Sequence, residues 1–399
     1  METSANGTFS AHRIPTLPDV PEVLQRARRG GRLEVADAVA LLACDDAELD
    51  PLLESAAWLR DEGKGRTVTY SPKVFLPVTN LCRDRCSYCT FRKDPWDEGA
   101  WTMTPDEVRD WTRRGRELGC REALLCLGDR PETAFRQYRA LLGLLGYEST
   151  IDYVARACEE VLAEGLWPHT NAGVMTREEL IRLKPLNVSM GLMLENVSPR
   201  LGARGGPHWA APDKDPEVRM KTITDAGELR IAFTTGILIG IGETLAERAE
   251  SLVAIRDVHE RYGHIQEVIV QNFRAKPDIR MAASPEPDGP EMARAVATAR
   301  LLLGAEMNLQ APPNLSPNGH RRLLAAGIND WGGISPLTRD YVNPEAPWPH
   351  VAKLAETCIS EGFELRPRLA VYPEYVDREG FLEPALREQV REEYARLGV

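Results

Sequence analysis

After residue 70 the chain alternates regularly between short apolar segments of strand length and helices with clear start signals, and this alternation constrains the fold most. Eight such strand–helix units follow one another. The strands are predicted at residues 74–78, 123–127, 167–174, 187–194, 231–239, 265–270, 308–311 and 328–331. Repeated βα units are typical of a parallel (β/α)8 barrel of the TIM type, an α/β fold. A doubly wound open sheet is the alternative, and it would bind ligands at one switch point.

Helix-start signals separate the predicted strands. A threonine followed three residues later by a glutamate is a capping box, and it predicts helices that begin after Thr104, Thr176 and Thr244. Asp215-Pro216 and Ser316-Pro317 are expected to open two more helices, because proline is favoured in the first turn. Further helices are predicted at residues 289–304 and 350–361.

The alternation divides the chain into three parts. Residues 1–70 are predicted to be an N-terminal helical extension that caps the barrel, with helices near 33–42 and 48–60. Residues 71–365 are predicted to form the barrel. Residues 366–399 are predicted to form a tail whose charged C-terminal helix packs on the barrel.

Charge and hydropathy argue against two classes of protein. The chain has 60 acidic and 49 basic residues, a formal net charge of −11 that argues against a nucleic-acid-binding protein. Its longest apolar stretch, residues 231–242, is too short and too polar to span a bilayer. Residues 1–10 lack the apolar core of a signal peptide, so we expect a cytoplasmic protein without membrane attachment.

Cys82, Cys86 and Cys89 follow the first predicted strand with the spacing C-x3-C-x2-C, which allows three thiolates to converge on one metal centre. Because a cubane 4Fe-4S cluster has four iron corners, three cysteine ligands leave one iron open to a substrate or cofactor. A structural zinc site needs four ligands, and the nearest histidines in the sequence are the distant His12 and His169. A metal-stabilised binding protein without catalytic activity is the alternative from another class.

The other five cysteines show no ligand spacing. We predict that they are buried small apolar residues in a reducing cytosol; they are Cys44, Cys120, Cys126, Cys158 and Cys358. In a (β/α)8 barrel the loops after the strands share one face, where active sites lie. The cysteine loop therefore lies at that face, and every other segment that follows a strand is a candidate wall of the same cavity.

A C-x3-C-x-Tyr-C loop after a first barrel strand resembles that of the radical S-adenosylmethionine (SAM) enzymes, and the resemblance covers the whole predicted barrel. It implies that Cys82, Cys86 and Cys89 hold a 4Fe-4S cluster whose open iron binds SAM. It further implies that one electron cleaves SAM to a 5′-deoxyadenosyl radical, which abstracts a hydrogen atom from the substrate. An electron donor such as a flavodoxin or a ferredoxin is implied as a partner.

The same resemblance assigns residues to a SAM site. Asp129 or Glu132, in the turn after the second strand, is expected to receive the methionine ammonium group. Ser189 and Glu195 match positions that bind ribose, and Arg200 matches one that pairs with the methionine carboxylate. The full expected set is Tyr88, Phe91, Gly128, Asp129, Glu132, Asn171, Ser189, Glu195, Arg200, and, beside adenine, Gly240 and Gly242.

Five segments give a finer resemblance, to the CofG-type 7,8-didemethyl-8-hydroxy-5-deazariboflavin synthases: residues 70–77, 86–91, 128–132, 271–276 and 329–336. This resemblance implies cyclisation of 5-amino-5-(4-hydroxybenzyl)-6-(D-ribitylimino)-uracil to the deazaflavin with loss of ammonia, a carbon–nitrogen lyase reaction. A CofH-type enzyme, which in some organisms is fused behind a CofG-like half, is implied as the source of this benzyl-uracil adduct. The alternatives within the class are a CofH-type enzyme and a radical SAM enzyme of the menaquinone pathway.

Polar residues at or near predicted strand ends are expected to bind this substrate, which carries a ribityl chain, a uracil ring and a phenol. They are His169, Asn171, Gln271, Asn272, Arg274, Lys276 and Asp330. One of His169, Asp330 and Lys276 is expected to move the proton that ring closure and ammonia loss require. Trp331 is expected either to stack on the aromatic adduct or to pack in the core.

Overall fold

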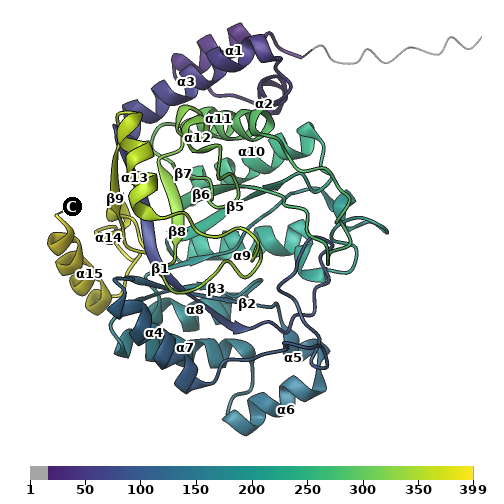
Figure 1. Ribbon diagram of the computed structural model, residues 1–399, viewed down its shortest axis with the longest axis vertical. Coiled ribbons are helices and arrows are strands. Elements are labelled where there is room, and N and C mark those ends of the chain that lie inside the picture. The colour runs from purple at the N-terminus through teal and green to yellow at the C-terminus, as the bar shows by residue number, and fades with distance from the viewer. Residues whose placement is uncertain (1–16, 399) are drawn as a thin grey trace, which may run out of the picture.

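A closed ring of eight parallel strands surrounded by helices forms the centre of the molecule, as the sequence predicts (Figure 1). The computed structural model describes residues 17–398, so the expectation for residues 1–10 lies outside the described residues. Strand β1 pairs with both β2 and β8 and thereby closes the ring. The strands are β1 (Thr67–Thr79), β2 (Glu122–Leu127), β3 (Trp167–Asn171), β4 (Ser189–Gly191), β5 (Phe233–Ile239), β6 (Ile265–Asn272), β7 (Asn308–Gln310) and β8 (Asp330–Ile334).

The outer helices begin largely where the start signals predict. Thr104, Thr176 and Thr244 each accept a hydrogen bond from the backbone N–H three residues later, which confirms the three capping boxes. The start predicted at Ser316-Pro317 is wrong, because the chain makes a turn there, with Gly319 N–H donating to Ser316 O, before its helix begins. The helices are α4 (Pro105–Glu117), α7 (Thr150–Ala163), α8 (Arg177–Leu183), α9 (Pro216–Glu228), α10 (Leu245–Tyr262), α11 (Gly289–Leu303), α12 (His320–Ala325) and α13 (Val351–Ser360).

Short elements fill three connections between strands and helices. The link from β2 to α7 contains α5 (Pro131–Ala134) and α6 (Arg136–Leu145). The 3-10 turn η1 (Lys184–Leu186) precedes β4, and η2 (Pro199–Gly202) and η3 (Pro212–Lys214) follow it. Within residues 17–398 no helix combines the length and apolarity needed to cross a bilayer.

The predicted N-terminal extension consists of α1 (Val20–Arg28), α2 (Val35–Leu42) and α3 (Asp46–Lys64). In Figure 1 these helices lie against the outer helices of the barrel, with α2 next to α10 and α3 next to α11. The buried Arg60 side chain ties α3 to the barrel, because its guanidinium donates to Leu324 O and Ile328 O at 2.9 Å. Apolar residues of the extension belong to the same core as the barrel.

The C-terminal tail closes the barrel mouth opposite the cysteine loop. It begins with β9 (Glu364–Pro367), which pairs with the start of β1, and continues through α14 (Pro373–Val376) and α15 (Pro384–Leu397). Its apolar residues pack on Val188 and Ala232, which lie just before β4 and β5. The boundaries expected at 70/71 and 365/366 fall inside β1 and β9, so the sheet continues past both.

Candidate active site

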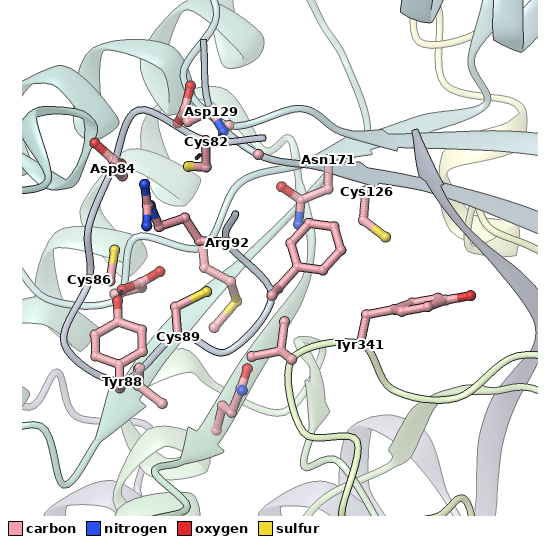
Figure 2. Close-up of a pocket in the computed structure, with 18 of the residues that line it drawn as sticks. Cys82, Asp84, Cys86, Tyr88, Cys89, Arg92, Cys126, Asp129, Asn171 and Tyr341 are labelled. Atoms are coloured by element: carbon pink, nitrogen blue, oxygen red, sulfur yellow. Dashed lines mark hydrogen bonds between the residues drawn. The ribbon is translucent and has the colours of Figure 1, made fainter. Parts of the chain in front are cut away.

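Cys82, Cys86 and Cys89 lie together on the loop after β1, and all three line a cavity of about 320 Å³ (Figure 2). Segments that follow other strands hold this loop in place. Arg83 N–H donates to Asp129 O at 3.0 Å, and Arg85 N–H donates to Ala210 O at 2.8 Å. The eight cysteines are all free thiols. Burial raises the pKa of the Cys86 thiol to about 12, so the thiolate form needs a positive centre beside it.

Asp129 faces the cavity next to the cysteine loop. Its backbone N–H donates to Cys82 Sγ at 3.1 Å, and its carboxylate accepts from Val174 N–H at 3.1 Å. Carboxylate atom Oδ1 is buried and has no hydrogen-bond partner within residues 17–398. Burial raises the pKa of this carboxyl to about 8, and the neighbouring Asp213 adds to the effect. The free oxygen is therefore suited to a cationic donor such as an ammonium group.

Of the two acidic residues expected to meet the methionine ammonium, only Asp129 lines the cavity. Glu132 lies on α5, and its carboxylate accepts hydrogen bonds from Thr150 Oγ1 at 2.5 Å and from Thr150 N–H at 3.4 Å, so it is engaged at the first turn of α7. Gly128 also lines the cavity.

Glu195 is a buried carboxylate on the opposite wall. It accepts hydrogen bonds from Tyr88 OH and Lys214 Nζ, and His208 Nε2 lies 3.3 Å from it. Burial alone would raise its pKa, but Lys214 and its other cationic neighbours hold the pKa well below the usual range. The buried Arg219 lines the same wall and donates to Met193 O. Glu195 is therefore ionised and firmly held at the cavity.

Besides Glu132, four residues expected at the SAM site lie elsewhere. Ser189 is the first residue of the three-residue strand β4, so it lies towards the opposite mouth, where its hydroxyl donates to the tail carbonyl of Ala370. Arg200 is half exposed, pairs with Glu247 and donates to Gly242 O at 2.7 Å. Gly240 and Gly242 adopt φ of +87° and +100° in the turn after β5, and neither lines the cavity. The resemblance implies that this segment lies beside adenine, but in the structure the two glycines form the turn after β5.

The candidate substrate residues separate into two groups. Gln271, Asn272, Arg274 and Lys276, which follow or end β6, line the cavity with Phe91 and Asn171, and His169 lies deeper in the barrel beside a second cavity of about 200 Å³. Asp330 and Trp331 lie outside both cavities, because β8 begins at Asp330 rather than ending there. Asp330 pairs with Arg368 at 2.6 Å, and Trp331 is fully buried against His320.

Several cavity residues are missing from the sequence prediction. Figure 2 shows Cys126 and Tyr341 across the cavity from the cluster cysteines, and Cys126 is thus not a simple core residue. Lys214 and Arg219, from the segment after β4, are absent as well. The residues after the true end of β8 also line the cavity; they are Asp340, Tyr341, Val342 and Asn343. Their position after the last strand could have identified them, but the sequence predicts that this strand ends at residue 331 rather than at Ile334.

Comparison with known proteins identifies the family. The Radical SAM superfamily profile matches residues 76–255, which include the cysteine loop. The chain is 50% identical over 312 residues to the 7,8-didemethyl-8-hydroxy-5-deazariboflavin synthase of Methanopyrus kandleri, an alignment that covers 78% of this chain and 93% of that protein. The chain belongs to this synthase family of radical SAM enzymes. It is also 50% identical over 405 residues to the FO synthase of Streptomyces coelicolor, covering 98% of this chain and 47% of the relative. The chain therefore spans about half the length of the FO synthases that it matches.

Two solved structures of other proteins share the fold of this chain. The FeFe-hydrogenase maturase HydG of Carboxydothermus hydrogenoformans superposes with a TM-score of 0.71 at 21% identity, covering 94% of this chain and 88% of that one. Methylornithine synthase (PylB) superposes with a TM-score of 0.66 at 18% identity, covering 87% of this chain and 97% of that one.

Family membership implies a 4Fe-4S cluster and SAM, and the residues present fit both. Three soft thiol ligands line one cavity, which leaves one corner of a cubane cluster without a protein ligand among them. The partnerless Asp129 Oδ1 and the ionised Glu195 face the same cavity and offer acceptors for ammonium and hydroxyl groups.

Proposed function

We propose that this chain cyclises 5-amino-5-(4-hydroxybenzyl)-6-(D-ribitylimino)-uracil to 7,8-didemethyl-8-hydroxy-5-deazariboflavin with loss of ammonia, as a carbon–nitrogen lyase. The observation that carries this proposal is the alignment with the Methanopyrus kandleri synthase. Half of the aligned residues are identical over 93% of that enzyme, so nearly all of it has a counterpart in this chain. The cavity at the cysteine loop supports the same conclusion, because it continues into the barrel interior through residues shared with the second cavity.

The residues that line the two cavities have distinct proposed roles. Cys82, Cys86 and Cys89 hold the cluster, which together with SAM supplies the 5′-deoxyadenosyl radical when bound. Asp129 receives the ammonium group of SAM, and Glu195 accepts hydrogen bonds from its ribose.

Substrate residues follow β6. Gln271 and Asn272 hydrogen-bond the substrate between the cluster and the barrel interior. Burial lowers the pKa of Lys276, so this ammonium is a better acid than a lysine in water, and we assign it the proton that the leaving amine takes up. Asp330 is not available for this step, because Arg368 holds its carboxylate away from both cavities.

A second enzyme is required to make the adduct. We propose that a CofH-type enzyme performs this step, either as a separate protein or as the other half of a longer chain. The FO synthases support this proposal, because the chain aligns with only 47% of the length of the Streptomyces coelicolor enzyme.

The reaction assignment is tested with anaerobically purified, chemically reduced protein, SAM and the benzyl-uracil adduct. Formation of the fluorescent deazaflavin with one 5′-deoxyadenosine per turnover is the expected result. Turnover of tyrosine with 5-amino-6-(D-ribitylamino)uracil instead would replace the assignment by the CofH-type reaction. A colourless protein that contains zinc would contradict both reactions and favour a non-catalytic binding protein.

We further propose that an acidic one-electron carrier protein, such as a flavodoxin or a ferredoxin, reduces the cluster from a groove outside the cysteine loop. Cys86 and Cys89 line this groove as well as the inner cavity, so the loop alone separates the two. Basic side chains dominate the groove: Arg85, Arg92, Lys93 and Arg280, against Asp278. Within residues 17–398 neither Lys93 nor Arg280 forms an ion pair. Unpaired positive charge on a chain of net charge −11 favours a negatively charged partner at this place.

A further inference from the structure

The interior of the barrel is built in layers, because inward-facing side chains alternate along each strand. Lys73 lies opposite Glu122, and two residues further along Phe75 lies opposite Leu124. The lowest layer contains Lys73, Glu122 and Glu267, the middle layer Phe75, Leu124 and Ile269, and the upper layer Cys126, Asn171 and Gln271. The second cavity therefore has a charged floor, an apolar middle and an open top that leads to the cysteine loop.

Opposite charges pair on the floor. Lys73 Nζ lies 2.7 Å from Glu122 Oε1. Arg368, which comes from the C-terminal tail, donates to Glu267 Oε1 at 2.7 Å and to Asp330 at 2.6 Å. These contacts fix the side chains: two cations face three carboxylates, and burial raises the pKa of Glu267 to about 7. The floor therefore offers no excess positive charge to an anionic ligand. A neutral ligand with hydroxyl groups can instead accept from the cations and donate to the carboxylates.

His169 presents a lone pair to this cavity. The Ser189 hydroxyl uses its one hydrogen to donate to Ala370 O at 2.7 Å. His169 Nδ1 lies 2.7 Å from the same hydroxyl oxygen, so Nδ1 must carry the hydrogen of that bond. Burial lowers the pKa of His169 to about 4, and the neutral ring then leaves Nε2 unprotonated. Among the described residues none donates to Nε2, so it is an acceptor available to a ligand.

The middle layer suits a flat ring. Phe75 stacks on Trp348 with ring centroids 5.2 Å apart and an angle of 12° between their planes. Both rings line the second cavity together with Leu124 and Ile269. A planar aromatic ligand that rests there lies between the charged floor and the cysteine loop.

We propose that the barrel floor is a binding subsite for a neutral polyhydroxyl chain, which enters first and donates a hydrogen bond to His169 Nε2. The ring system that carries the chain then rests on the Phe75 layer, with its reacting carbons towards the cysteine loop. This inference rests on the proposed function, because the ribityl chain of the adduct is the polyhydroxyl chain in question. It adds the orientation of the substrate and the residues that set it.

The test measures binding rather than turnover. Cluster-loaded protein, kept oxidised with SAM present, is titrated into the fluorescent 7,8-didemethyl-8-hydroxy-5-deazariboflavin and into an analogue with methyl in place of ribityl. Fluorescence anisotropy reports both dissociation constants. We expect the ribityl compound to bind about tenfold more tightly, the effect of one or two hydrogen bonds in a buried site. The His169→Phe variant is expected to lose most of this preference and to bind the methyl analogue as before.

Controls separate this inference from the proposed function. His350→Phe makes the same change at an exposed position outside both cavities and should leave the preference intact. Equal affinity of the wild-type protein for the two compounds overturns the polyhydroxyl subsite without any variant. A preference that survives in a folded His169→Phe variant overturns the role of His169. Failure of both compounds to bind counts against the proposed function itself.

Discussion

Gly128 shows how closely the chain packs behind the cysteine loop. A Cβ atom built at this position lies 2.0 Å from Leu81 O and 2.6 Å from Cys82 Cβ. Both neighbours belong to the loop, so a Gly128→Ala substitution must displace it. We expect this variant to hold well under half of the wild-type iron after anaerobic reconstitution, measured as iron per chain.

Gly143→Ala provides the matched control for this prediction. Gly143 lies in α6, and a Cβ atom there has no neighbour within 4 Å. We expect the Gly143→Ala variant to bind as much iron as the wild type. Its free energy of unfolding should be unchanged or higher by up to about 1 kcal/mol, because alanine favours a helix. A Gly128→Ala protein with full iron content would show that the loop adapts.

The buried pair of Lys73 and Glu122 lends itself to a double-mutant cycle. Glu122→Leu leaves the Lys73 ammonium buried without its partner, which costs about 3–5 kcal/mol in free energy of unfolding. The double variant Lys73→Met/Glu122→Leu should recover most of this loss, since it removes both charges. Urea denaturation measures the wild type, Glu122→Leu, Lys73→Met and the double variant. If the loss of unfolding free energy in the double variant equals the sum of the two single losses, the two charged groups do not interact.

The ends of the strands are the part of the individual elements that the sequence predicts least well. All eight strands and most helix starts follow from apolar segments and capping boxes. The sequence, however, predicts the last strand at 328–331, whereas β8 is Asp330–Ile334, so Asp330 and Trp331 lie at the start of the strand rather than at its end. The cause is Gly332-Gly333, which resembles a turn. These glycines are needed inside β8, because a Cβ at Gly333 would lie 2.2 Å from the Lys73 side chain and one at Gly332 2.0 Å from Gln310.

The sequence could predict that Cys82, Cys86, Cys89 and Asp129 lie at one cavity, because short spacings within one loop or turn identify them. The positions of Ser189 and Arg200 could not be predicted. That of Ser189 depends on where the three-residue strand β4 begins, and that of Arg200 depends on its ion pair with Glu247. The charged floor was equally out of reach. It requires residues from β1, β2, β6 and the tail to meet, and no single stretch of sequence contains that information.

Residues 368–372 of the tail plug the lower mouth, and helix α15 packs over them, with Tyr394 OH donating to Val371 O. The attachment of α15 to this plug can be tested. Val390 is fully buried against the tail core, while its neighbour Gln389 is exposed. Val390→Asp would bury an unpaired carboxylate, and we expect it to cost at least about 3 kcal/mol or to detach the helix. Thermal unfolding and limited proteolysis before residue 384 report these effects. Gln389→Asp should change neither, and equal behaviour of the two variants would contradict this attachment.

At the scale of the whole molecule, the charge distribution bears on the proposed electron carrier. The chain is acidic overall, yet the groove beside Cys86 and Cys89 is basic. Attraction between a small basic site and an acidic carrier acts mainly on the association rate and is screened by salt. Complexes of this kind are typically small and weak. A carrier docked here would lie close to the cluster, with only the cysteine loop between them.

Charge reversal in this groove should slow reduction by a protein but not by a small molecule. We expect Lys93→Glu/Arg280→Glu to weaken binding of a reduced, acidic flavodoxin about tenfold at low salt and to flatten the salt dependence of the cluster reduction rate. Dithionite should reduce the wild-type and variant clusters equally, since it needs no docking surface. Lys353→Glu changes an exposed charge on α13, away from the groove, and should match the wild type apart from a small general effect. If Lys353→Glu weakens flavodoxin binding as much as the groove variant, overall charge rather than the groove governs the encounter.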